Sequence, residues 1–170
     1  VTISTADTNT NLAATELVDG TYQVYTIDIA GNLSGASSNS VTVDTAAPTV
    51  SSVAISSATG VQNSLLNQTD VVSVTATFSE NVTVEVTGGS PQLTLLVGST
   101  DQTATYSASS GNQVVFTYTI QAGETDTNGI SIEANKLTLN SGTIRDAAGN
   151  NATLTHNAVA DNPGYKVDNA

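Results

Sequence analysis

The sequence predicts an all-β protein, and within that class an antiparallel, immunoglobulin-like β-sandwich with Greek-key connections. Apolar and polar residues alternate with a period of two in several segments, as they do in strands with one buried face. Clusters of glycine, proline, asparagine and serine separate these segments at the short intervals typical of a sandwich. No segment keeps the 3.6-residue apolar spacing of a helix for three turns, so we expect almost no helix.

The alternating runs predict seven or so strands, and the parity of each run predicts which side chains face the core. The inward-facing residues are, in chain order, Val72, Val74, Ala76 and Phe78; Leu93, Leu95 and Val97; Ala104 and Tyr106; Val114, Phe116, Tyr118 and Ile120; Ile130 and Ile132; and Leu137 and Leu139. Earlier in the chain, residues 20–29 and 40–43 are expected to be the last two strands of a separate sandwich.

Two short motifs occur twice, in the same order, and indicate modules in tandem. Residues 28–32 (DIAGN) match residues 146–150 (DAAGN), and residues 43–46 (VDTA) match residues 167–170 (VDNA). Repeats longer than about 20–50 residues are whole domains in series. We therefore expect residues 1–44 to be the C-terminal part of one module and residues 45–170 to be a complete second module, in a window cut from a longer array.

The composition excludes several classes of partner. The 170 residues contain no cysteine, methionine or tryptophan, and 15 acidic against 3 basic side chains give a net charge of −12. Phosphate binding needs clustered lysine and arginine, so we expect no nucleic-acid partner, and no anionic membrane surface either. No apolar run of about 18 residues is present, so we expect no direct insertion into a membrane. The acidic surface suits solubility and divalent cations.

Several of these motifs resemble a known family. The DxAGN sequences, residues 43–48 (VDTAAP) and residues 77–82 (TFSENV) resemble bacterial immunoglobulin-like repeats, the extender modules of very large surface adhesins, including those of the RTX type. Residues 122–132 and 142–150 are similar to a longer variety of these repeats. The resemblance covers nearly the whole chain. It implies an extracellular location on the bacterial cell surface, a spacer role and calcium at module junctions. It also implies neighbouring repeat modules of the same chain as partners, with the distal ligand bound by other domains.

Strand parity predicts where the acidic residues of the repeats meet. If residues 71–78 form the second strand and the segment ending at residue 145 the sixth, the loops after both lie at the pole where the chain enters. Glu80, Asp146 and Asn150 then project beside Asp44 of the linker. Three carboxylates and one amide carbonyl suit Ca²⁺, which takes six to eight oxygen ligands at about 2.3–2.6 Å. We therefore predict a junction calcium site at these four residues.

The same residues also have a structural interpretation. Asp146 can close an Asx-turn in which Gly149 supplies a positive φ angle, and Glu80 can be a simple turn residue. Asp28 and Asn32 repeat the Asp146 pattern in the preceding module. We expect no bound ion there, because the rest of that site is missing.

A second, weaker metal candidate is the loop that contains Glu124, Asp126 and Asn128. Alternate oxygen-bearing side chains followed by a glycine resemble the first half of an EF-hand loop. The twelfth position from Glu124 is Asn135 instead of glutamate, and no flanking helices are expected, so a full EF-hand is excluded. The alternative is a polar hairpin turn.

We do not expect an enzyme. His156 is the single imidazole and cysteine is absent, so the further histidine or cysteine ligands of a zinc site are missing, and a catalytic triad would need a partner that orients His156. His156 is expected at the surface or at a strand edge. The acidic residues fall in turns, and only seven aromatic residues are available to hold a sugar beside a pair of carboxylates.

The function that these observations favour is a spacer module of a bacterial surface or secreted adhesin, made rigid by calcium at its junctions. One alternative is a carbohydrate- or protein-binding module that uses its exposed strand faces. Another is a non-catalytic accessory domain of an extracellular hydrolase. A binding module would need an exposed aromatic or apolar patch, which most of the aromatic positions, on inward parity, do not provide.

Overall fold

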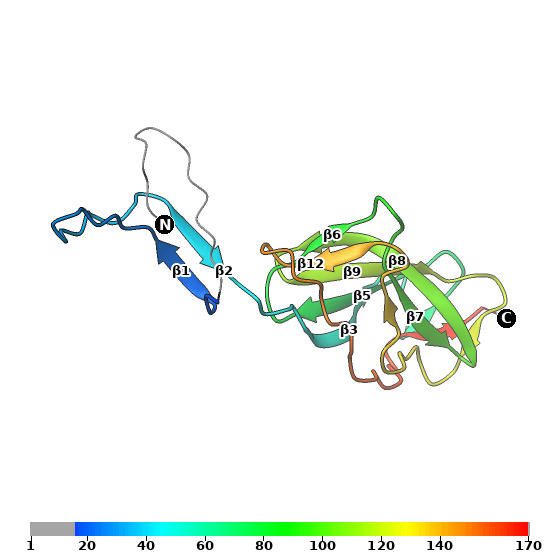
Figure 1. The fold of residues 1–170 in the computed structure, drawn as a ribbon. Helices are drawn as coiled ribbons and strands as arrows, with labels where there is room; N and C mark the ends of the chain where they lie inside the picture. The colour runs from blue at the N-terminus through cyan, green and yellow to red at the C-terminus, as the bar shows by residue number, and fades with distance from the viewer. Residues whose placement is uncertain (1–15, 170) are drawn as a thin grey trace. The chain divides into compact units, whose positions relative to one another are not determined.

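The computed structural model of the chain describes residues 16–169, and this part contains strands and no helix (Figure 1). The strands are β1 (Gly20–Gln23), β2 (Ser40–Val43), β3 (Val50–Ala58), β4 (Leu65–Leu66), β5 (Val71–Phe78), β6 (Thr83–Glu85), β7 (Gln92–Val97), β8 (Thr100–Ser110), β9 (Gln113–Thr119), β10 (Thr125–Asp126), β11 (Leu137–Thr138), β12 (Thr143–Arg145) and β13 (Lys166–Asp168). Contacts divide the chain into two units, residues 1–46 and 47–170. The division falls two residues after the predicted boundary at residue 44.

In the first unit, β1 and β2 form an antiparallel pair in which Tyr22 lies opposite Val41. The predicted strand over residues 20–29 is too long, because β1 ends at Gln23 and only an isolated bridge joins Ile27 to Leu33. Several apolar side chains of this unit, including Ile27 and Val41, are more than half exposed.

The second unit is built on a six-stranded sheet with the order β11-β7-β8-β9-β5-β3. β7, β8 and β9 are joined by tight hairpins, while β5 reaches β7 through a longer connection that contains β6. Since β5 lies beside β9, the order β5-β9-β8-β7 is a Greek key. The all-β fold with a Greek-key connection is therefore confirmed.

Two smaller sheets complete this unit. β13 lies between β10 and β4, and β12 pairs with β6. Most pairs are antiparallel as predicted, but β13 and β4 run parallel. Leu66 of β4, Val167 of β13 and Ile144 of β12 join the same buried cluster as the inner face of the six-stranded sheet. The large sheet and the small sheets therefore share one core, an arrangement consistent with a β-sandwich.

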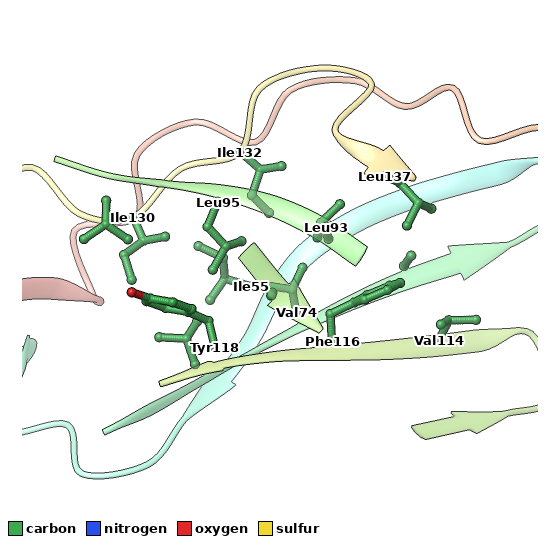
Figure 2. Close-up of a cluster of buried hydrophobic side chains, with 14 of the residues drawn as sticks. Ile55, Val74, Leu93, Leu95, Val114, Phe116, Tyr118, Ile130, Ile132 and Leu137 are labelled. Atoms are coloured by element: carbon green, nitrogen blue, oxygen red, sulfur yellow. The ribbon is translucent and has the colours of Figure 1, made fainter. Parts of the chain in front are cut away.

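The predicted parity of the long strands is confirmed. Val74 of β5 and Phe116 of β9 have no exposed surface, and they pack with Leu93 and Leu95 of β7 (Figure 2). Burying one such side chain stabilises the fold by roughly 1.5–3 kcal/mol. This cluster holds the large sheet in its curled form and so fixes the loops at its ends.

Two predicted strands are shorter or less regular than expected. Ile130 and Ile132 are buried as predicted, but this segment makes only isolated bridges, from Ser131 to Leu96 and from Ile132 to Val159. β11 ends at Thr138. Within residues 16–169, no helix is long and apolar enough to cross a lipid bilayer.

Candidate metal centre

Glu80 lies where β5 ends beside the start of β3. Phe78, the last residue of β5, is paired with Val50, the first residue of β3. The next residue, Ser79, donates its N–H to the carbonyl O of Thr49 at 2.8 Å and accepts the N–H of Thr49 on its Oγ at 3.0 Å. These two bonds fix the turn out of β5. They leave Glu80 half-buried at the end of the sandwich where residues 47–49 lead into β3.

Asp146 reaches the same end through a different pair of strands. β12 pairs with β6 so that Arg145 lies opposite Thr83, the first residue of β6. Thr83 is three residues after Glu80, and Arg145 directly precedes Asp146. The register of this short pair therefore brings the residue after β12 to the residues that precede β6.

A closed loop holds the Asp146 carboxylate in place. The main-chain N–H of Asn150 donates to Oδ1 at 2.8 Å, and its side-chain Nδ2 donates to Oδ2 at 2.8 Å. The N–H of Gly149 donates to the main-chain O of Asp146 at 3.3 Å, and Gly149 has φ +96°. The Asx-turn interpretation of Asp146 is therefore confirmed, and the side chain of Asn150 is positioned by the carboxylate it contacts.

The first unit contains the same loop. Asn32 donates to Asp28 through its main-chain N–H at 2.8 Å and through its side-chain Nδ2 at 2.8 Å, and Gly31 has φ +88°. The repeated sequence DxAGN thus encodes one loop geometry twice. Glycine suits the fourth position of the motif because it adopts a left-handed φ without the strain that a side chain brings.

Hydrogen bonding keeps the Asp146 carboxyl group ionised although it is buried. Burial opposes ionisation, but the bonds from Asn150, Gly149 and Ala148 outweigh it, so the pKa of Asp146 lies below its usual value. The side chain is only 6% exposed. A buried carboxylate that stays charged next to other acidic groups is a site at which a cation is electrostatically favoured.

Asp44 supplies the third carboxylate. Its Oδ1 accepts the N–H of Ala46 at 3.1 Å, which closes a local turn. The next residue, Thr45, donates to Oδ1 of Asp19 through its N–H at 2.9 Å and its hydroxyl at 2.7 Å. The segment after β2 is therefore held by side-chain bonds at two successive residues.

The three carboxylates meet. One oxygen from each of Asp44, Glu80 and Asp146 lies within 4.8 Å of the other two. Oxygens on opposite sides of a bound Ca²⁺ are about 4.6–5.2 Å apart, because each lies about 2.3–2.6 Å from the ion. Three acidic oxygens at this spacing are the hard ligands that Ca²⁺ prefers, so the residues present fit this ion.

The second candidate loop is organised differently. Glu124 accepts the hydroxyl of Tyr118 on Oε1 at 2.5 Å and the N–H of Gln121 on Oε2 at 2.8 Å. Burial, together with this bond and the charge of Glu124, raises the pKa of Tyr118. The carboxylate of Glu124 therefore closes the turn after β9.

Asp126 and Asn128 have other partners. The buried carboxylate of Asp126 accepts the N–H of Gly98 at 2.8 Å on Oδ2, and the N–H groups of Asn128 at 3.3 Å and Gly129 at 2.7 Å on Oδ1. The amide of Asn128 donates to Asp161 at 2.6 Å. These contacts give the residues of the second candidate separate structural roles, and metal binding there stays a prediction.

His156 is buried, so the surface alternative of its prediction is wrong, while it does lie beside the start of β11, the last strand at one edge of the large sheet. Its Nε2 accepts the main-chain N–H of Lys136 at 2.9 Å, and its Nδ1 lies 2.8 Å from the carbonyl O of Asn157. Since Nε2 accepts, the ring carries its proton on Nδ1 and donates it to Asn157. The imidazole thus ties the segment around residue 156 to the start of β11.

No known protein family, no curated protein and no solved structure matches the chain.

Proposed function

We propose that the chain is part of a spacer in a bacterial surface or secreted adhesin, with calcium stiffening the segment that enters the second unit. The observation that carries this proposal is the meeting of Asp44, Glu80 and Asp146 within 4.8 Å. Asp44 belongs to the sequence that links two modules of the repeat, and the other two residues lie in loops of the following sandwich.

Calcium would act here by removing freedom from the linker. Three carboxylates at this spacing repel one another, and a divalent cation converts that repulsion into a shared set of bonds. The linker residue and the two loops would then move as one body. The distal ligand would be bound by other domains, and this chain would set their distance from the cell.

Within residues 16–169, several titratable side chains of the second unit have structural partners, which supports a mechanical role. The carboxylates of Asp44, Glu124 and Asp146 close turns, and the single histidine is committed to two hydrogen bonds in the interior. Phe78, Phe116 and Tyr118 lie in the core, so they form no exposed platform for a sugar ring.

Calcium titration of the full 170-residue chain tests this proposal. At a calcium concentration of a hundred times the dissociation constant, which is roughly 10⁻⁴–10⁻³ M in extracellular modules, binding should stabilise the second unit by about 2.7 kcal/mol. We expect a rise in Tm that EDTA reverses, together with a narrower distance distribution in small-angle X-ray scattering.

Matched variants separate the proposed site from general charge effects. Glu80→Gln should abolish the calcium response, whereas Glu85→Gln, which removes an exposed carboxylate from β6, should retain it. An unchanged Tm and unchanged scattering in calcium and in EDTA would rule out the calcium-stiffened spacer.

A further inference from the structure

Among the described residues 16–169, no strand pairs with the outer edge of β3 along most of its length. β3 is the last strand of the six-stranded sheet, and its nine residues contain no charge and no proline. The N–H of Phe78 donates to the carbonyl O of Asn112, away from β3, at 2.8 Å. Val50 of β3 lies opposite Phe78, and in an antiparallel ladder two opposite residues either bond to each other or both point away. The N–H and C=O of Val50 therefore point to the outer edge of β3. Such groups are a template for another chain.

This edge already accepts a strand at one point. Thr153 pairs with Thr49 in parallel, and its N–H donates to the carbonyl O of Pro48 at 2.8 Å. In Figure 1 the orange chain after β12 passes β3 here.

The chain then leaves β3, because its next residues bond to the segment before β11. The carbonyl O of His156 accepts the N–H of Asn135 at 3.2 Å, and Val159 and Ile132 exchange both main-chain bonds at 2.7 and 3.0 Å.

A hollow of about 460 Å³ opens where residues 155–158 separate from β3. Its lining residues, here called the β3 groove, are Val50, Ser51, Ser52, Val53, Ala134, Asn135, Thr155, His156, Asn157 and Ala158. The lining offers hydroxyls, amides and small apolar groups, with no carboxylate and no ammonium group. His156 uses both ring nitrogens within the fold, so it does not bring a charge to the groove.

We propose that the β3 groove binds an extended peptide, which adds to β3 as a strand and continues the pairing that Thr153 begins. Four residues of β3 line the groove, and at about 3.3 Å per residue they take about four residues of peptide. The neutral lining requires an uncharged centre to that peptide, since a buried unpaired charge is costly. The net charge of −12 favours basic residues at its ends.

The test uses the full chain labelled with ¹⁵N and a synthetic peptide blocked at both termini. The peptide has alternating valine and threonine at six central positions and one lysine at each end. We expect amide shifts confined to the residues of the β3 groove, 50–53, 134–135 and 155–158. Ala158→Trp fills the groove from an exposed position and should weaken binding at least tenfold. Ala108→Trp, at an exposed position of β8 outside the groove, should leave the affinity unchanged.

Three results would overturn the proposal. Shifts elsewhere in the chain would place the peptide outside the groove, and equal binding by Ala158→Trp would exclude the hollow as the site. Shifts of the groove amides with maltose but not with the peptide would assign the groove to a neutral sugar. A peptide with glutamate at both ends should bind more weakly than the lysine peptide at low salt. Neither variant touches Glu80 or Asp146, so failure here leaves the calcium proposal standing.

Discussion

Asn150 binds both oxygens of the Asp146 carboxylate, one through its main-chain N–H and one through its side-chain amide, each at 2.8 Å. Asn32 and Asp28 make the same two bonds in the first unit. The aspartate of the motif is thus a structural residue in both copies. In the second copy the aspartate also belongs to a group of three carboxylates, with Glu80 and Asp44, that could hold a metal ion.

These two loops provide a matched pair of variants. Asp146→Asn places an amide where the loop supplies only donors, so we expect a loss of about 1–3 kcal/mol in the unfolding free energy of the second unit. It should also remove the rise in Tm caused by calcium. Asp28→Asn makes the same change in the first unit and should leave the calcium response intact. A calcium response that survives in Asp146→Asn would exclude this carboxylate as a ligand.

The buried carboxylate of Asp126 should be important for stability without any metal. It is 3% exposed and accepts three main-chain N–H bonds. Asp126→Ala leaves these donors unsatisfied and should cost about 3 kcal/mol by urea unfolding. Asp101→Asn, which removes an exposed ion pair with Lys136, should cost less than about 1 kcal/mol. Similar losses in the two variants would contradict this role.

Gly129 should tolerate no side chain. Its φ is +104°, and a Cβ there would overlap the carbonyl O of Asn162. Gly129→Ala must move backbone, and we expect it to destabilise the fold by about 3 kcal/mol or more in chemical unfolding. Gly123 has φ +80° with nothing within 4 Å of the added Cβ, so Gly123→Ala should cost only the backbone strain, about 1 kcal/mol. Equal costs would show that close packing at Gly129 is unimportant.

Alkaline pH should act through Tyr118. Burial and the hydrogen bond to Glu124 raise its pKa above the ordinary value of 10.0. The folded state then holds this proton more tightly than the unfolded state, so the stabilisation is complete below pH 10 and is lost as the pH rises above it. Tyr118→Phe should lower the unfolding free energy by about 1–3 kcal/mol at pH 7. It should also make the unfolding free energy depend less on pH between about pH 10 and 12. Unfolding curves across this range, with tyrosinate absorbance at 295 nm, provide the measurement. If the unfolding free energy of Tyr118→Phe fell with pH as steeply as that of the unmodified chain, Tyr118 would not be the group responsible.

Strand faces could be predicted because side-chain parity is a local property. Val72 to Phe78 and Val114 to Ile120 alternate strictly, and the structure buries the predicted face of both. The short strands were harder to predict, since β4 and β10 have two residues each and carry no period. Their pairing with β13 depends on contacts across the whole chain.

The acidic cluster was predicted from a premise that is partly wrong. β5 is the third strand of the second unit instead of the second, because the two-residue β4 precedes it. Glu80 still reaches the predicted end because β3 and β5 are antiparallel neighbours, and β4 adds no reversal between them within the large sheet. The β3 groove had no sequence signal, since it arises where residues 155–158 leave an edge they follow at Thr153.

The parallel pair of β4 and β13 has a mechanical consequence. β4 lies near the beginning of the second unit and β13 near its end, and both point the same way. Once β3 has come away from β5, tension applied to the two ends of this unit pulls β4 and β13 in opposite directions along their common axis. The force then loads all the hydrogen bonds between the two strands at the same time, so they must break together. In a hairpin pulled at its open end, by contrast, the bonds break one after another. The pairing of β4 with β13 therefore resists extension through its topology, without any contribution from an ion.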